Sequence, residues 1–107
     1  MRDEIVAAVK AAGVVGAGGA GFPTHVKINA TVELVIANGA ECEPLLRANE
    51  HLMEEQSEKV ILGLKTVMLA TGARSGYIAL KPKHEKAVQQ LQAAIKRMNE
   101  QEIKLVF

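Results

Sequence analysis

Cysteine and aromatic residues are scarce in this sequence, and it has neither a strong net charge nor a long apolar run. Its single cysteine excludes an internal disulfide and is typical of a reducing compartment, so we expect a cytoplasmic protein. Aromatic residues make up only 3% of 107 residues, which predicts an aliphatic core. The net charge of +1 gives no strong attraction to nucleic acid or anionic lipid. Because no apolar run approaches the roughly 20 residues of a membrane-spanning helix, we expect no direct membrane insertion.

Hydrophobic periodicity predicts one α/β domain. Residues 2–12 predict a short amphipathic helix, with Asp3 as a candidate cap and Gly13 at its end. Buried strands are predicted at residues 32–38, 76–80 and 103–107. Between them, apolar residues at helical spacing predict two helices, one from about residue 49 to residue 70 and one that starts at Pro82.

The order of these elements predicts the sheet. Because helical crossovers join successive strands, β-α-β-α-β predicts parallel pairing in a Rossmann-like, three-layer α/β fragment that follows an N-terminal helix and a glycine-rich loop. The last strand reaches the end of the sequence with no closing element. We therefore expect residues 1–107 to be part of a larger subunit.

The stretch GVVGAGGAGFPTHVK, residues 13–27, holds five glycines. Gly16, Gly18 and Gly21 match the letters of the dinucleotide fingerprint, but a helix precedes them and Pro23 follows, where the fingerprint needs a strand and then a helix. Bare backbone of this kind can approach a flat or anionic group closely, and Lys27 can add a point charge. A flexible loop or an ordinary tight turn is the simpler alternative.

A second polar stretch, NGAECEP, comes directly after the first predicted strand, at residues 38–44. Crevices at the carboxyl ends of parallel strands commonly bind ligands. Asn38 offers a donor and an acceptor, and Glu41 and Glu43 offer acceptors, which suit the hydroxyls of a ribityl or ribose chain or the imide edge of a flavin. A solvated turn with Asn38 capping the strand explains the same residues equally well.

The two stretches together, GAGGAGFPTHVK and NGAECEP around one apolar strand, resemble the flavin- and NADH-binding core of the RnfC family. That family is related to the flavoprotein subunit of respiratory complex I, which reads approximately GRGGAGFPTGxKW and NADExEPG, and to the electron-transfer protein PrdC. The resemblance implies a partial domain that binds FMN and NAD(H), in a parent subunit whose flavin passes electrons from NADH to iron–sulfur clusters.

By motif position, the resemblance also implies roles for single residues. Backbone would approach the flavin and the nicotinamide at the glycines, Lys27 would face the flavin phosphate, Asn38 would bond the flavin, and the two acids would line the nucleotide pocket. The candidate cofactor-binding residues are therefore Gly16, Gly18, Gly19, Gly21, Lys27, Asn38, Glu41 and Glu43. No side chain is predicted to be catalytic.

The sequence departs from the complex I pattern at two positions and lacks the family's later motifs. Ala17 stands where complex I has arginine, and Ala40 where it has an acid, a change that RnfC-like members share. A segment resembling YPxGxE and the cysteine-rich cluster motifs are not in the sequence. The iron–sulfur clusters are therefore implied only for the rest of the parent protein.

The resemblance implies partners, and the residues leave other interpretations open. The implied partners are the remainder of the subunit and other electron-transfer subunits, through which any membrane association would arise. An alternative is a structural or assembly domain without a cofactor, which associates through an exposed sheet edge. A third interpretation is a phosphate or nucleotide binder that uses the glycine-rich loop alone.

Histidine and cysteine do not form a metal-binding pattern in this sequence. His25, His51, His84 and Cys42 lack the spacing of a zinc site, so no metal ligand is predicted. His25 lies beside the glycine-rich stretch, where a nucleotide contact is one option. His51 and His84 are predicted on helix surfaces, and Cys42 is predicted to be a packing residue.

Overall fold

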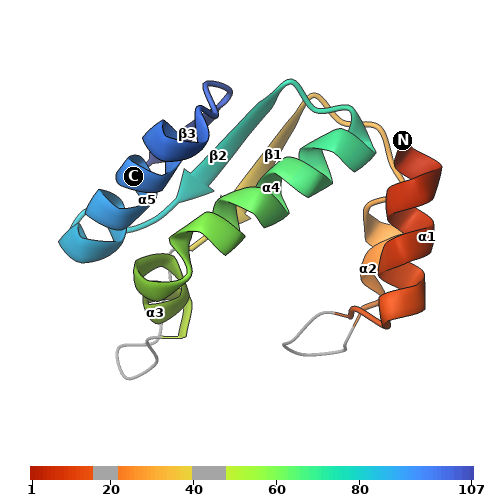
Figure 1. Cartoon of the computed structure of the whole chain (residues 1–107), viewed down its shortest axis with the longest axis horizontal. Helices are drawn as coiled ribbons and strands as arrows, with labels where there is room; N and C mark the ends of the chain where they lie inside the picture. Colours follow the sequence, from red (N-terminus) through yellow and green to blue (C-terminus); the bar gives the residue numbers. More distant parts are fainter. Residues whose placement is uncertain (16–21, 40–47) are drawn as a thin grey trace.

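The computed structural model describes residues 1–15, 22–39 and 48–107. In this part of the chain, helices and strands follow one another from α1 to β3 (Figure 1). Their bounds are α1 Arg2–Ala12, α2 Thr24–Lys27, β1 Leu34–Asn38, α3 Ala48–Glu55, α4 Ser57–Thr71, β2 Ser75–Ala79, α5 Glu85–Met98 and β3 Ile103–Val106. The predicted α/β class and the β-α-β-α-β order are confirmed.

The three strands form one parallel sheet in the order β1-β2-β3. Ile36 pairs with Tyr77, and Tyr77 pairs in turn with Lys104. Because side chains alternate along a strand, these three residues share one face of the sheet. Ile78 and Ile103 lie on the other face and are buried.

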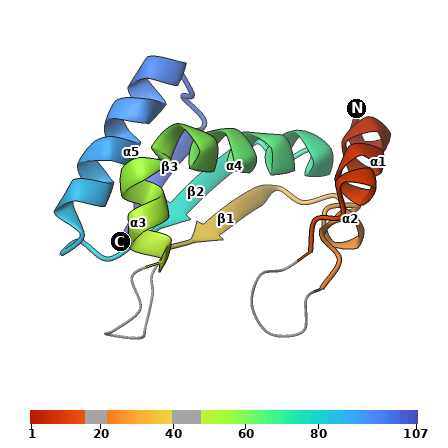
Figure 2. The same ribbon diagram turned by 60° about the horizontal axis from the view of Figure 1, so that its bottom comes forward.

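Helices α3, α4 and α5 all lie on the face of the sheet that holds Ile78 (Figure 2). The opposite face is open in the described part of the chain, with Leu34 and Ile36 of β1 exposed. Of the three predicted layers, the described residues therefore supply the sheet and one helical layer.

The core lies between the sheet and this helical layer, and it is aliphatic as predicted. Helix α4, strand β2 and helix α5 each contribute side chains with almost no exposed surface. The most deeply buried large residues are Ile61 of α4, Ile78 of β2, Leu80 after β2 and Leu91 of α5.

The single long helix predicted from residue 49 to residue 70 is wrong, because the structure divides it into α3 and α4. Gln56 between them has φ −122° and ψ 37°, which is outside the helical region. The break changes the direction of the chain, so that α3 packs on α5 while α4 follows the sheet. The predicted end is confirmed, because Gly72 closes α4 with φ 73°.

Two local predictions also need correction, and one short helix was not predicted. Met1, not Asp3, occupies the cap position of α1, and no side chain caps this helix; Asp3 lies in the first turn, where a negative charge favours the helix dipole. Pro82 does not begin α5, which starts at Glu85 after His84. The short helix α2 was not predicted, since four residues carry too little periodicity to show it.

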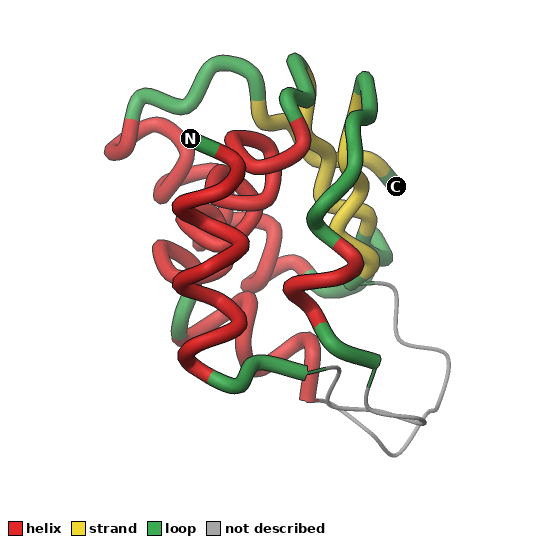
Figure 3. The backbone as a smooth tube through the Cα atoms, turned by 90° about the vertical axis from the view of Figure 1, so that its right-hand side faces the viewer, coloured by secondary structure: helices red, strands yellow, loops and turns green. Residues whose placement is uncertain are grey.

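Arg2 attaches α1 to the rest of the protein. Its Nε donates to the carbonyl oxygen of Ala70 at 2.7 Å, and its Nη2 donates to Oγ1 of Thr31 at 2.6 Å. Helix α1 itself has no buried residue, although Ile5, Val6 and Val9 are half-buried. Figure 3 views the molecule from this end, with α1 in front and the strands to its right. Arg2 therefore adds two hydrogen bonds to the contacts that the half-buried apolar side chains of α1 make.

Candidate functional site

The structure describes two of the eight candidate cofactor-binding residues, Lys27 and Asn38. The other six, which are Gly16, Gly18, Gly19, Gly21, Glu41 and Glu43, lie outside the described residues, as does Cys42. The site can therefore be built from the residues that flank the two motifs.

Two contacts join the chain on either side of the glycine-rich motif. The amide of Thr24 donates to the carbonyl oxygen of Val14 at 3.2 Å, and Val15 forms an antiparallel bridge with Pro23. Helix α2 begins directly after this bridge and ends at Lys27, whose side chain is exposed. The flanks of the motif are thus held together, with an exposed ammonium group one turn away.

Asn38 is the last residue of β1 and is exposed on the open face of the sheet. Its partner in the register is Ala79 of β2. The next residue, Gly39, donates its amide to the carbonyl oxygen of Ala79 at 2.7 Å, which continues the ladder past the end of the strand. Asn38 therefore stands at the carboxyl end of a firmly paired strand, where open α/β sheets bind ligands.

An apolar hollow of about 160 Å³ lies beside this strand end. Helix α3 and the start of α4 form one wall, and β1 with its neighbour β2 forms the other. Its lining residues are Ala37, Asn38, Gly39, Leu52, Met53, Val60 and Ile78. The hollow lies on the face of the sheet that the helices cover, whereas the exposed side chain of Asn38 belongs to the opposite face.

Figure 1 shows that α1 and β1 both end toward the lower side of the molecule. The flank of the glycine-rich motif and the carboxyl end of β1 are thus on the same side. Convergence of Gly18 and Asn38 on one crevice stays a prediction, because Gly18 lies outside the described residues.

His84 and Glu50 form a polar pair that the sequence did not reveal. His84 Nε2 lies 3.5 Å from Glu50 Oε2, and the two side chains are 12% and 14% exposed. The prediction that His84 lies on a helix surface is therefore wrong: α3 covers it, and no local pattern shows that packing. His51, which was predicted on the same grounds, is exposed.

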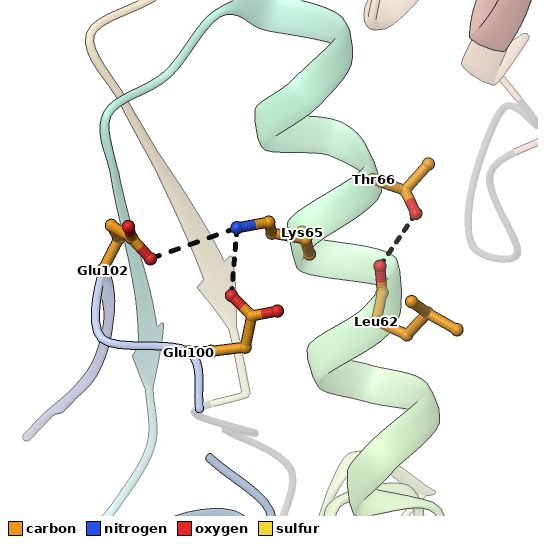
Figure 4. A network of polar contacts seen from close by, with 5 residues as sticks. All are labelled: Leu62, Lys65, Thr66, Glu100 and Glu102. Atoms are coloured by element: carbon orange, nitrogen blue, oxygen red, sulfur yellow. Dashed lines mark hydrogen bonds and ion pairs between the residues drawn. The ribbon is translucent and has the colours of Figure 1, made fainter. Parts of the chain in front are cut away.

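A second polar network lies at the other end of the sheet, near the start of β3 (Figure 4). Lys65 of α4 lies 3.0 Å from Oε2 of Glu100 and 4.0 Å from Oε2 of Glu102. The hydrogen bond to Glu100 raises the pKa of Lys65 above its ordinary value, and the charges of both acids act in the same direction. On the same helix, Thr66 Oγ1 donates to the carbonyl oxygen of Leu62 at 2.8 Å. This network attaches α4 to the turn before β3 and has no part in the candidate site.

Within the described residues, no group of three or more His, Cys, Asp or Glu side chains is placed to hold a metal ion. In the same part of the chain, no helix has the length and apolar character needed to cross a membrane.

Comparison with known families decides the class of the protein. The family described as the Nuo51 FMN-binding domain matches residues 9–107. The chain belongs to this FMN-binding domain family. The sequence match thus includes both motifs and every element from the end of α1 to β3.

Relatives of this FMN-binding domain include subunits of electron-transfer complexes. Cobalamin reductase PduS of Salmonella typhimurium is 54% identical over 89 residues, which are 83% of this chain and 20% of the relative. One subunit of the Na⁺-translocating ferredoxin:NAD⁺ oxidoreductase complex of Acetobacterium woodii is 46% identical over 87% of this chain and 22% of the relative. The resemblance to the RnfC family is confirmed, and the chain spans about a fifth of the length of these relatives.

Solved structures show the same fold for this FMN-binding domain. A chain of the NAD⁺-reducing [NiFe]-hydrogenase in the air-oxidized state superposes with a TM-score of 0.82 at 29% identity. The match covers 99% of this chain and 20% of the hydrogenase chain. In the H₂-reduced state the TM-score is 0.84 at 27% identity. The Rossmann-like α/β arrangement is therefore shared by this much larger chain.

The described side chains fit part of what FMN requires. A flavin has a flat, largely apolar ring system and a polar edge that both donates and accepts hydrogen bonds. Asn38 carries one donor group and one acceptor group on the open face of the sheet, and a hollow lined mainly by aliphatic side chains lies on the covered face at the same strand end. Lys27 adds an exposed cation at the flank of the glycine-rich motif.

Proposed function

We propose that this chain is the first part of an FMN- and NADH-binding domain in an electron-transfer subunit. When bound, FMN would accept a hydride, which carries two electrons, from NADH. It would then pass the electrons one at a time to iron–sulfur clusters held elsewhere in the parent protein. The observation that carries the proposal is the family match over residues 9–107, which includes both motifs around β1. Residues 1–107 then form a partial domain of a larger subunit.

The chain's own residues hold and orient the cofactors in this proposal. Asn38 hydrogen-bonds the polar edge of the flavin from the carboxyl end of β1. Lys27 faces the flavin phosphate as a point charge. The four motif glycines let backbone amides approach the flavin and the nicotinamide, while the two acids of the second motif accept hydrogen bonds from nucleotide hydroxyls; they are Gly16, Gly18, Gly19, Gly21, Glu41 and Glu43.

The proposed partners follow from the same assignment. The remainder of the subunit completes the cofactor site, and other electron-transfer subunits accept the electrons. The relatives support this, because one of them is named as a subunit of a Na⁺-translocating oxidoreductase complex. We propose a cytoplasmic location, with any membrane association arising through partner subunits.

Titration with FMN tests the proposed function. The protein, expressed in the full reading frame of its gene, should quench flavin fluorescence at a stoichiometry of one FMN per chain. Asn38→Ala should weaken binding by roughly tenfold, because hydrogen bonds to the flavin edge are lost. Gln92→Ala removes a matched amide from an exposed position of α5 and should leave the affinity unchanged.

Reduction by NADH tests the second half of the proposal. Stopped-flow absorbance should show bleaching of the bound flavin on addition of NADH. A protein that binds no FMN, or an Asn38→Ala variant that binds it as tightly as the parent, would contradict the assignment. If the protein binds FMN but NADH does not reduce the bound flavin, the proposed flavin site stands and the proposed nicotinamide site is wrong.

A second candidate function is self-association through the sheet. The observation in its favour is that β1 and β3 are both edge strands within the described residues, and the face they share with β2 is open. Light scattering at two protein concentrations tests it. A strictly monomeric species at both concentrations would count against this candidate.

A further inference from the structure

His84 is nearly enclosed between two helices, at the position just before α5. It occupies the cap position of α5, yet its side chain caps no amide of that helix. Instead, Nε2 faces Glu50 in the first turn of α3, at 3.5 Å from Oε2. Within the described part of the chain, Nδ1 is buried and has no hydrogen-bond partner. The imidazole is therefore directed at α3 and not at its own helix.

The two ring nitrogens differ in what they can do in this position. A neutral imidazole carries one N–H group, and placing it on Nε2 supplies a donor to the Glu50 carboxylate. Nδ1 is then a buried lone pair. A hydrogen on Nδ1 would instead be a buried donor without an acceptor, which is costly. The surroundings thus favour the form in which the hydrogen is on Nε2, facing the Glu50 carboxylate.

Helix α3 is held at a second point, against the end of β1. Met53 lies one turn after Glu50, is 3% exposed, and packs directly on Gly39. Together with its neighbour Leu52, it lines the hollow beside Asn38. The position of α3 therefore affects the shape of that hollow, and the contact between Glu50 and His84 joins the first turn of the helix to the residue before α5.

We propose that His84 is a positioning residue, which acts through Glu50 to fix α3 against the carboxyl end of β1 and so shapes the hollow beside Asn38. The part of this inference that concerns the cofactor rests on the proposed function, since it takes the hollow as part of the flavin site. The part that concerns α3 does not depend on any ligand.

Four variants of the full-length protein separate positioning from general stability. His84→Phe keeps an aromatic ring and removes the donor, whereas His84→Gln retains an N–H group at the place of Nε2. Glu50→Gln removes the charge from the other side of the contact. The matched control is Arg97→Gln, which breaks the contact of Arg97 Nη2 with Glu58 Oε1 at 2.9 Å between α5 and α4 and leaves α3 untouched.

The first measurement is amide hydrogen exchange without ligand. His84→Phe and Glu50→Gln should raise the exchange rates of α3 and of the Gly39 amide by roughly tenfold, as expected when one polar contact to a charged group is lost from a local opening equilibrium. His84→Gln should restore rates close to those of the parent, and Arg97→Gln should not change α3. Equal α3 exchange in His84→Phe and the parent, or the same rise in Arg97→Gln, would overturn the proposal.

The second measurement is the affinity for FMN, obtained by fluorescence titration. His84→Phe should bind more weakly by several-fold, and His84→Gln should recover the affinity. If α3 exchange rises but the FMN affinity stays at the parental value, the link from α3 to the cofactor site is wrong. If the parent itself binds no FMN, the proposed function fails, and the exchange measurement alone decides the role of His84.

Discussion

Gly39 and Met53 are packed so closely that a side chain at position 39 would displace the end of the Met53 side chain. A Cβ atom there would lie 2.6 Å from Sδ and 2.9 Å from Cε of Met53, and 3.1 Å from the carbonyl oxygen of Ala79. Met53 is 3% exposed and also lines the apolar hollow of about 160 Å³, so its thioether would have to shift toward that space. This contact joins the carboxyl end of β1 to α3, across the segment that carries the second cofactor motif.

Gly39→Ala should therefore destabilise the protein, by about 1–3 kcal/mol, which is typical for overpacking of a tight core position. Urea denaturation followed by circular dichroism measures the change. In a Met53→Ala background, Gly39→Ala should lower the free energy of unfolding much less, because most of the Met53 side chain that the new methyl group would contact is absent. An unfolding free energy equal to that of the parent would show that the chain adapts without strain.

Gly63→Ala should have the opposite effect and serves as a comparison at a second glycine. Gly63 lies in the interior of α4 and is exposed, and a Cβ atom added there would meet no described atom within 4 Å beyond its own helix backbone. Alanine restricts the unfolded chain and favours the helix, so we expect stabilisation of about 0.5–1 kcal/mol. The same denaturation experiment checks it, and a destabilised variant would contradict the placement of Gly63 on an open helix face.

Arg2→Ala should release α1 while leaving the core folded. The substitution removes both hydrogen bonds of Arg2, to Ala70 and to Thr31, from a helix that has no buried residue. We expect faster amide exchange confined to α1 and earlier proteolysis near the N-terminus, with an unchanged unfolding transition for the remainder. Lys10→Ala, which removes an exposed cation from the same helix, is the control. Exchange that is equally slow in α1 of both variants would argue against this role of Arg2.

Lys65 should make stability fall in alkaline solution. Its pKa is raised in the folded protein above the ordinary value of 10.5, so the folded state retains the proton more strongly than the unfolded state. The stabilisation is complete below pH 10.5 and is lost as pH rises through the folded pKa.

Denaturation from pH 8 to roughly pH 11 checks this, with Lys65→Met compared against Lys59→Met, an exposed lysine on the same helix. The Lys65→Met variant should lose less stability over this range than the parent, whereas Lys59→Met should follow the parent. Parallel curves for all three proteins would contradict the raised pKa.

Much of the fold could be predicted from the sequence, because it depends on periodicity within short segments. The strands, the αL glycine at the end of α4 and the aliphatic core all follow from local patterns. The break at Gln56 could not be predicted from local patterns, since the residues around it continue a helical pattern. The change of direction comes from the packing of α3 on α5. Helix α2 was missed because one turn is too short to show a period.

The candidate site also has a part that the sequence predicted and a part that it did not. Asn38 was correctly placed at the carboxyl end of a parallel strand, although the prediction that this strand is buried is wrong, because one of its faces is exposed. The cofactor role of Asn38 stays a prediction, together with those of Lys27, the four glycines and the two acids. The part that sequence reasoning missed is His84, which was assigned to a surface. A lone histidine before a helix shows no partner in its own neighbourhood, and Glu50 lies 34 residues away.

Sequence alone determined the family, the order of the elements and the two motifs, because each of these depends on residues that are adjacent or regularly spaced along the chain. Only the tertiary structure decided that α3 turns away from α4, that Met53 packs against Gly39, and that His84 meets Glu50. The physical reason is that such contacts join residues distant along the chain, and their geometry exists only after helices and sheet have packed together.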